Sequence, residues 1–238
     1  MKETYLFRLQ RIYTKKSFQR KLDYIEYNFG PIIRRFKSRK NISVLEVGPG
    51  LGEFVKYLNS VGVKDIDVID SDRNVLKNLN KKFNISNSYY SDNIISVKNR
   101  LRKYDLIVLI QVLEHISAKV YFSVIKTLYS KLKKKGTVLI VVPNANNPLG
   151  SVERYGDLQH QMAFTSQSLK DLVMGSGIVN YNLEIRGYSI PPYSLINLIR
   201  ILLQKILHLI LLGLMVVNGG SFFKVMTPNL TLIVEKKS

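Results

Sequence analysis

Three glycines, each two residues after the last, are the clearest chemical feature of the sequence. Gly48, Gly50 and Gly52 follow the apolar run at 44–47, and helical spacing of apolar residues resumes at Phe54. This order predicts a buried strand, a tight turn and the start of a helix. Glycine lets a backbone adopt positive φ and approach a ligand, and a helix N-terminus offers free N–H groups. We therefore expect a nucleotide-like cofactor here; the alternative is a tight strand-to-helix connection that binds nothing.

An acidic residue closes the next predicted strand. The apolar run at 66–69 leads to Asp70, which lies 18 residues after Gly52. A carboxylate in that position can accept both hydroxyls of a ribose, as in dinucleotide-binding folds. The glycines are not spaced G-x-G-x-x-G, and this disfavours a nicotinamide or flavin cofactor.

Two motifs resemble those of the class I S-adenosylmethionine (SAM)-dependent methyltransferases. The first is L-E-V-G-x-G-x-G at 45–52, together with the acid that closes the second strand. The second is Y-D-L-I-V-L-I-Q-V-L-E-H-I at 104–116, which is similar to the fourth-strand motif of that family. The resemblance covers about residues 40–180. It implies a Rossmann-like fold, SAM as the cofactor and methyl transfer as the reaction.

The resemblance also implies which residues bind the cofactor. The glycines are expected to hold the methionine end and the adjoining ribose, Asp70 the ribose hydroxyls, and Asp92 with Asn93 the adenine. An acid and an amide supply the acceptor and donor that adenine needs, but S-D-N at 91–93 is equally a turn and helix N-cap. Gln111 should lie at the carboxyl end of the fourth strand, where ligands collect. The predicted cofactor site comprises Glu46, Gly48, Gly50, Gly52, Asp70, Ser71, Asp92, Asn93 and Gln111.

Glu114, His115 and His160 are the candidate catalytic residues, with three interpretations open. In small-RNA 2′-O-methyltransferases and some ubiquinone-pathway O-methyltransferases, E-x-x-E-H contributes ligands for a divalent metal that polarises acceptor hydroxyls. This chain has Gln111 in place of the first Glu, which removes a negative ligand, so a metal is disfavoured and no metal ligand is predicted. Without metal, His115 or His160 can act as general base, since imidazole titrates near neutrality. In the third interpretation, Glu114 and His115 are a family signature that only caps and orients the loop.

Strands alternate with helices through the middle of the chain. Strands are predicted at 43–47, 65–69, 87–90, 105–110, 137–142, 181–187 and 230–235, and helices at 52–60, 73–81, 94–101 and 117–134. The last helix is expected to end in the stop signal K-K-K-G at 133–136. This alternation predicts an α/β fold: with the resemblance, a Rossmann-like, seven-stranded, mostly parallel sheet with helices on both faces. The methyltransferase domain is assigned to 41–189 and 222–238.

An N-terminal helical cap is predicted at 1–40. Residues 3–38 show amphipathic helical spacing, which Gly30-Pro31 is expected to break. In the family that this chain resembles, such helices often cover the cofactor and shape the acceptor pocket. The alternative is a packing helix with a solvated basic face.

A hydrophobic helical insertion is predicted at 190–221, before the last strand. Ser194 can cap a helix over 195–217, and its polar residues fall on one face: Asn197, Arg200, Gln204 and His208. Arg200 and Lys205 interrupt the apolar run, which is then shorter than the ~20 residues needed to cross a membrane. The pattern favours an interfacial helix on anionic lipid. A lid over a lipid-like acceptor, a homodimer face and a buried helix are the alternatives.

Composition sets further bounds on the function. The 238 residues contain no Cys, so disulfides, thiolate ligands and a Cys nucleophile are excluded. No secretory signal is visible, so we expect a cytoplasmic protein, peripheral on the inner membrane face if the 195–217 helix contacts lipid. The net charge of +19 favours nucleic acid, anionic lipid or phosphorylated substrates. A lysine-rich surface without functional meaning is the alternative.

These observations predict a SAM-dependent methyltransferase. Among such enzymes they favour an O-methyltransferase that acts on a sugar or lipid-linked biosynthetic intermediate. One alternative is an RNA methyltransferase, which the charge and the partial metal motif favour. No aromatic and basic nucleic-acid module is visible in the sequence, so nucleic acid is the less favoured partner. A second alternative is a non-catalytic SAM-binding protein associated with a membrane.

Overall fold

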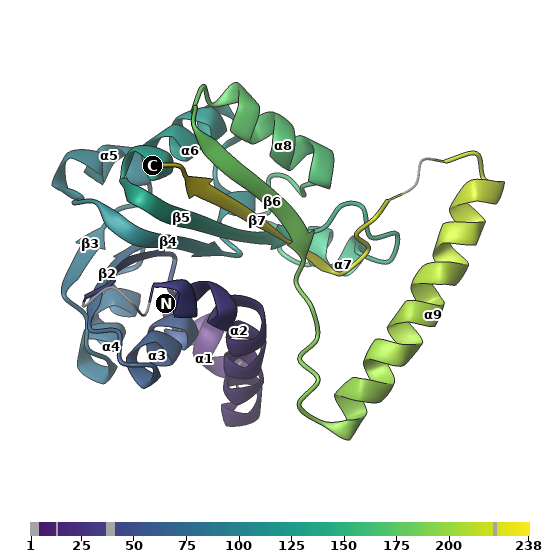
Figure 1. Cartoon of the computed structure of the whole chain (residues 1–238). Coiled ribbons are helices and arrows are strands. Elements are labelled where there is room, and N and C mark those ends of the chain that lie inside the picture. Colours follow the sequence, from purple (N-terminus) through teal and green to yellow (C-terminus); the bar gives the residue numbers. More distant parts are fainter. Residues whose placement is uncertain (1–4, 13, 37–40, 221–222) are drawn as a thin grey trace.

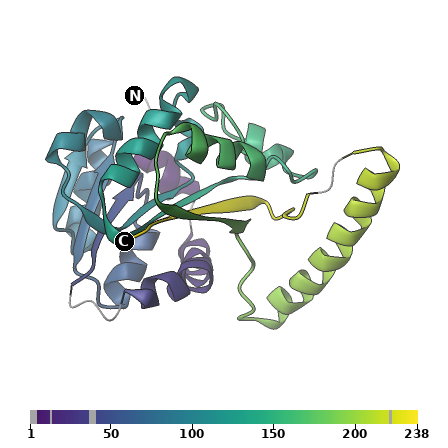
Figure 2. The ribbon, with the colours of Figure 1, turned by 45° about the horizontal axis from the view of Figure 1, so that its top comes forward.

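The computed structural model describes residues 5–12, 14–36, 41–220 and 223–238, and this part of the chain forms a seven-stranded sheet with helices on both faces (Figures 1 and 2). The strand order is β3-β2-β1-β4-β5-β7-β6. The first five strands are parallel, and β7 is antiparallel to both β5 and β6. The predicted α/β, Rossmann-like architecture is confirmed.

Most predicted elements are present within one or two residues. The strands are β1 Ser43–Val47, β2 Asp65–Asp70, β3 Asn87–Tyr90, β4 Tyr104–Ile110, β5 Leu132–Pro143, β6 Tyr181–Gly187 and β7 Asn229–Lys236. The helices are α1 Tyr5–Ile12, α2 Lys15–Arg35, α3 Glu53–Ser60, α4 Arg73–Lys82, α5 Ile94–Val97, α6 Tyr121–Ser130, α7 Ser151–Tyr155, α8 Ser166–Gly175 and α9 Leu195–Val217. The helix predicted at 94–101 is divided into α5 and a 3₁₀ turn, Lys98–Arg100.

Apolar side chains pack on both faces of the sheet, because successive residues of a strand point to opposite faces. Leu109 of β4 belongs to a core cluster with Leu128 of α6, on the face that α5, α6 and α8 cover. Val108, the preceding residue, belongs to a second cluster with Phe54 of α3, on the face of α2, α3 and α4. The two layers leave the carboxyl ends of the parallel strands open between them.

Helix α2 runs through Gly30-Pro31, so the predicted break is wrong. Tertiary contacts hold the helix around the proline: Phe29 and Ile32 are buried in the core, and the side-chain amide of Asn28 bonds with the backbone of Ser189 at 2.8 and 2.9 Å. This packing outweighs an intrinsic penalty for proline of about 3 kcal/mol. Residues 1–4, 13 and 37–40 of the predicted cap lie outside the described residues.

Helix α6 ends earlier than predicted. Its last residue is Ser130 and β5 begins at Leu132, so the K-K-K-G run lies in the strand and is not a helix stop. Leu132 is fully buried opposite Tyr104, and Lys133 donates a hydrogen bond to Asp105 at 2.7 Å. These contacts with the distant strand β4 decide the boundary, and the local stop signal does not.

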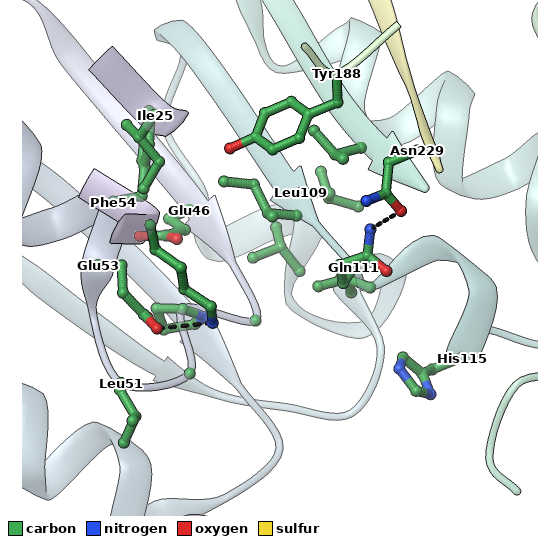
Figure 3. A pocket seen from close by; sticks show the side chains of 18 of the residues that line it. Ile25, Glu46, Leu51, Glu53, Phe54, Leu109, Gln111, His115, Tyr188 and Asn229 are labelled. Carbon is green, nitrogen blue, oxygen red and sulfur yellow. Dashed lines mark hydrogen bonds and ion pairs between the residues drawn. The ribbon is translucent and has the colours of Figure 1, made fainter. Parts of the chain in front are cut away.

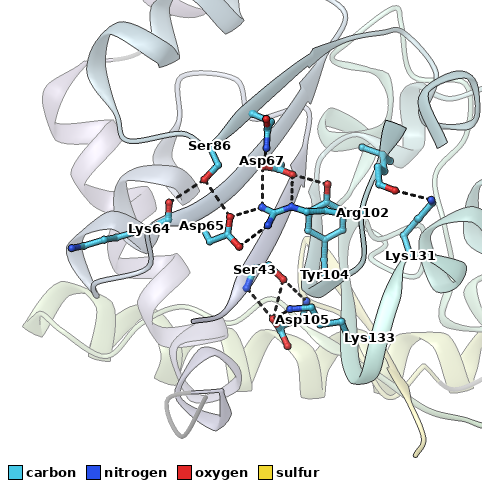
Figure 4. Close-up of polar contacts among 12 residues, drawn as sticks. Ser43, Lys64, Asp65, Asp67, Ser86, Arg102, Tyr104, Asp105, Lys131 and Lys133 are labelled. Atoms are coloured by element: carbon cyan, nitrogen blue, oxygen red, sulfur yellow. Dashed lines mark hydrogen bonds and ion pairs between the residues drawn. The ribbon is translucent and has the colours of Figure 1, made fainter. Parts of the chain in front are cut away.

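A polar network closes the amino-terminal edge of the sheet (Figure 4). Arg102 donates hydrogen bonds to Asp65 and, at 2.9 Å, to Asp67. Asp67 is fully buried and also accepts a hydrogen bond from the Tyr104 hydroxyl at 2.8 Å. Because these charges are paired with one another and lie at the edge opposite the glycine turn, we assign them to the fold and not to chemistry.

The hydrophobic insertion forms α9, with the predicted bounds. The Ser194 hydroxyl caps it, accepting a hydrogen bond from the Asn197 N–H at 3.2 Å. Figures 1 and 2 show α9 standing apart from the sheet, joined to β6 and β7 by two connecting segments. All residues of α9 are described and none is buried. Among the described helices, α9 is long and apolar enough to cross a membrane, with a mean hydropathy of 2.0, so Arg200 and Lys205 do not exclude a span on composition.

Candidate cofactor and acceptor site

A pocket of about 860 Å³ lies at the carboxyl ends of β1, β2 and β4 (Figure 3). Its volume is typical of sites for small-molecule cofactors. The predicted residues that line it are Glu46, Gly48, Gly50, Asp70, Ser71, Asp92, Gln111 and His115. The predicted residues that adjoin these but do not line the pocket are Gly52, Asn93, Glu114 and His160. The structure therefore brings most of the expected constellation to one place.

The glycine turn has a backbone that other residues rarely adopt. Gly48, Gly50 and Gly52 have φ of +68°, +55° and +86°. A Cβ on Gly48 would lie 2.4 Å from Val112, and one on Gly52 would lie 2.5 Å from Leu79 of α4. Gly48 and Gly50 thus bring the backbone close to the pocket, whereas the observed role of Gly52 is to let α4 pack against the turn.

Two buried carboxylates face the pocket. Glu46 is 3% exposed and Asp70 is 7% exposed. Burial raises the pKa of Asp70 to about 6, although the Asp72 N–H donates to it at 2.7 Å. Burial, then the charges of Glu53 and Asp70, hold the pKa of Glu46 well above its usual range. One Glu46 oxygen has no hydrogen-bond partner among the described residues. Desolvated acids in an open pocket suit a cationic ligand that carries hydroxyls, as SAM does.

The loop after β3 separates the two polar residues that were expected to bind adenine. Asp92 is exposed and lines the pocket. Asn93 caps α5 instead, since its side-chain oxygen accepts a hydrogen bond from the Ile95 N–H at 2.8 Å. The N-cap alternative is therefore observed for Asn93.

Helix α2 covers one side of the pocket, as the resemblance implies for an N-terminal helix. Lys21 forms an ion pair of 2.8 Å with Glu53 at the start of α3, and Tyr24 stacks on Tyr188 with 5.7 Å between ring centroids. Arg20 also lines the pocket. Sequence reasoning missed these individual residues, because a helical repeat shows which face is apolar but not which of its side chains contact distant parts of the chain.

Gln111 directly follows β4 and has a strained backbone. Its φ of +56° lies in the left-handed region that a residue with a side chain rarely adopts. The Gln111 N–H donates to the Val141 carbonyl at 2.9 Å, and its side-chain amide donates to Asn229 at 2.9 Å (Figure 3). Two neighbouring strands thus fix the direction of this side chain. Sequence reasoning missed Asn229, which lies 118 residues away along the chain.

Glu114, His115 and His160 converge at the edge of the pocket. Their potential ligating atoms all lie within 4.8 Å of one another, and the two imidazole centroids are 4.7 Å apart. His115 lines the pocket, while His160 lies beside it. The Nδ1 of His160 bonds to the Arg154 carbonyl at 3.1 Å. Because a carbonyl only accepts, this Nδ1 carries the proton and the neutral ring has its lone pair on Nε2.

Glu114 is the buried member of this cluster. Its side chain is 0% exposed, and neither carboxylate oxygen has a partner among the described residues. Burial raises its pKa to about 8, so the group is largely protonated at neutral pH. One carboxylate and two imidazoles fit a divalent cation, which would polarise an acceptor hydroxyl if bound. The prediction that disfavours a metal rests on Gln111, and this donor set does not include Gln111.

Helix α9 contributes to the pocket from the other side. Arg200 and Gln204, which belong to its predicted polar face, line the pocket. The side-chain amide of Asn197 donates to the Pro191 carbonyl at 2.9 Å, and Arg200 donates to Asn197 at 3.3 Å. The polar face of α9 therefore turns toward the site.

The comparisons with known proteins agree with this geometry. A family of methyltransferase domains matches residues 15–182. An uncharacterized protein of Methanocaldococcus jannaschii is 28% identical over 116 residues, which cover 49% of this chain and 47% of that protein. This chain thus spans about half the length of that relative.

Solved structures share the fold. A SAM-dependent methyltransferase from Archaeoglobus fulgidus is 20% identical, with a TM-score of 0.63 over 93% of this chain and 97% of that one. The plantazolicin methyltransferase BpumL in complex with S-adenosylhomocysteine is 16% identical, with a TM-score of 0.62 over 97% and 90%. The methyltransferase domain of a bacterial Hen1 is 16% identical, with a TM-score of 0.57 over 90% and 100%.

The chain therefore belongs to the methyltransferase domain family. It is a class I SAM-dependent methyltransferase, and SAM is its cofactor. The orphaned oxygen of Glu46 and the close backbone at Gly48 fit that cofactor.

Proposed function

We propose that the chain transfers the methyl group of SAM to a hydroxyl oxygen of a sugar or lipid-linked biosynthetic intermediate. One observation carries the proposal: the cluster of Glu114, His115 and His160 adjoins the pocket, with His115 in its lining. A hydroxyl is a poor nucleophile until a base or a cation takes or polarises its proton, and imidazole does this near neutral pH.

SAM supplies an electrophilic methyl group on its sulfonium. The chain's residues hold the partners in line: Gly48 and Asp70 bind the cofactor side, and His115 accepts the acceptor's proton as the new C–O bond forms and the C–S bond breaks. His160 and Glu114 position that ring. Gln111, held by Asn229, orients the acceptor.

Charge and hydrophobicity around the pocket support the acceptor class. Arg20 and Arg200 both line the pocket, which favours an acceptor that carries phosphate. The outer face of α9, the helix that carries Arg200, is apolar and suits a lipid tail. Such an acceptor places the reaction at the cytoplasmic face of a membrane.

The test uses tritium-labelled SAM with three acceptor pools: lipid-linked sugar phosphates, free sugars and total RNA. We expect label in the first or second pool, with loss of label when His115→Ala is used in place of the wild type. Label in RNA, together with RNA binding that weakens steeply with salt, would instead support RNA as the acceptor, a candidate that the +19 charge favours. Tight SAM binding without label in any pool would mark a non-catalytic protein.

A further inference from the structure

The outer face of α9 carries about half of the exposed large hydrophobic residues in the described part of the chain. Of the 25 exposed large hydrophobic residues in the described part of the chain, 13 belong to α9. Examples are Leu195 at 73% and Leu209 at 70% exposed. Exposed apolar surface of this extent marks a binding surface for a partner or a membrane.

We propose that α9 lies in the plane of an anionic membrane surface, with its apolar face in the lipid and the pocket opening toward the headgroups. This membrane contact deepens the proposed function. The expectation that the acceptor at the membrane is lipid-linked rests on that proposed function. The membrane contact itself depends only on α9 and its connections.

The connections of α9 exclude a membrane span even though its length allows one. Residues 188–194 lead into α9 and 218–228 lead out of it, and these segments leave from neighbouring points of the sheet, since Gly187 pairs with Leu230. A spanning α9 would force residues 218–228 to return through ~30 Å of hydrocarbon. The described residues of that segment form no helix or strand, and lipid does not accept unpaired backbone. The helix therefore stays on one side.

The distribution of residues around α9 matches an interfacial helix. At about 100° per residue, the exposed apolar side chains occupy an arc of about 180°. Arg200 and Lys205 lie just beyond the two edges of this arc, where long cationic side chains reach headgroups while the helix lies in the lipid. Asn197, Gln204 and His208, the least exposed polar residues, face the protein.

The charge of the segment that contains α9 and the width of its apolar arc favour lipid over a second copy of the chain. Between Glu184 and Glu235 the sequence has no acidic residue, while Arg200, Lys205 and Lys224 are basic. Anionic headgroups complement this segment, and an identical segment does not. A partner helix would also cover a seam narrower than the apolar arc and leave its flanks in water.

Binding is tested by co-sedimentation of the full chain with vesicles of phosphatidylcholine alone or mixed with phosphatidylglycerol. We expect binding to the anionic vesicles that is about tenfold tighter than to neutral ones. The double variant L202Q/I206Q, at the centre of the apolar arc, should lose about 100-fold in vesicle affinity. The control L158Q/M174Q, which changes exposed apolar residues outside α9, should bind as the wild type does.

Orientation is tested with single cysteines, since the natural chain has none. Pro192→Cys and Asn218→Cys are at exposed positions in the connecting segments, one before α9 and one after it. An impermeant maleimide is added outside vesicles with bound protein. Reaction at both ends is expected. Protection of one end alone would show a span and overturn the in-plane orientation.

Two further outcomes are informative: one concerns what covers the apolar face of α9, and the other separates the membrane contact from the proposed acceptor. Wild type that stays in the supernatant and is a stable dimer, with monomers formed by L202Q/I206Q, would show that α9 is a dimer face. S-adenosylhomocysteine affinity measured for every variant shows that the fold is intact. Vesicle binding without methylation of any lipid-linked acceptor would refute the proposed acceptor and leave the membrane contact standing.

Discussion

Asp70 is the residue at which cofactor binding and stability should oppose each other. Burial raises its pKa from 3.8 to about 6, so the folded protein binds a proton more tightly than the unfolded chain does. For an acid with a raised pKa, stability is greatest at low pH and falls as the pH rises through the folded pKa. Raising the pKa of Asp70 from 3.8 to about 6 costs the folded protein about 3 kcal/mol of stability at high pH, and about 2 kcal/mol of this loss occurs between pH 4.5 and 7.5.

Asp70→Asn should remove this penalty from the cofactor-free protein. The amide oxygen can still accept the hydrogen bond from the Asp72 N–H, observed at 2.7 Å. Urea denaturation should show that the variant gains about 2 kcal/mol over the wild type as the pH rises from 4.5 to 7.5. Taking the difference between the two proteins cancels the titrating groups that Asp70 does not influence. Glu46, whose pKa the charge of Asp70 helps to raise, changes the difference in the same direction.

The same substitution should weaken SAM binding. Loss of a charged acceptor for ribose hydroxyls predicts a dissociation constant about 10- to 100-fold higher at pH 7.5. Wild-type affinity should fall below pH 6 as Asp70 is protonated, while the variant's affinity stays flat. Asp72→Asn, on the same loop but outside the pocket lining, is the matched control. Identical pH profiles for wild type and Asp70→Asn, or unchanged SAM affinity, would refute the reasoning.

Three further predictions concern the same pocket. The wild type should lose about 4 kcal/mol of stability between pH 5 and 9 because the pKa of Glu114 is raised to about 8, and Glu114→Gln should remove this loss. An equal change in the unfolding free energy of wild type and variant between the two pH values, measured with urea, would contradict this. His115→Ala should lower turnover about 100-fold or more with near-normal SAM affinity, and a smaller effect of His160→Ala would place His160 in a positioning role. Gly48→Ala should weaken SAM binding in calorimetry, since a Cβ there would meet Val112 at 2.4 Å, whereas unchanged affinity would show that the turn adapts.

Local signals in the sequence were sufficient for the elements that depend on them. The bounds of α9 were predicted correctly because Ser194 supplies a cap and Gly219 follows its end, and β1 because the glycines stop it. The break at Pro31 and the end of α6 at Ser130 were mispredicted, since the core around Phe29 and contacts with β4 decide them. Such contacts depend on residues far away in the sequence.

The site was predictable where a motif carries the geometry. The glycine turn, Asp70 and the E-H pair are motif positions, and the structure brings them to one pocket. Asn93 and Gly52 have motif positions too, but local capping and packing against α4 account for them. The approach of Arg200 depends on the path of the connecting segment at 188–194, which carries no periodic signal.

The central claim is that this pocket binds SAM in an active methyltransferase fold, and calorimetric titration of the full chain tests it most directly. S-adenosylhomocysteine should bind one-to-one with micromolar affinity, at equal strength with Mg²⁺ and with a chelator, since the expected cofactor contacts involve Gly48, Asp70 and Asp92 and no metal. Absence of binding under all of these conditions would contradict the account.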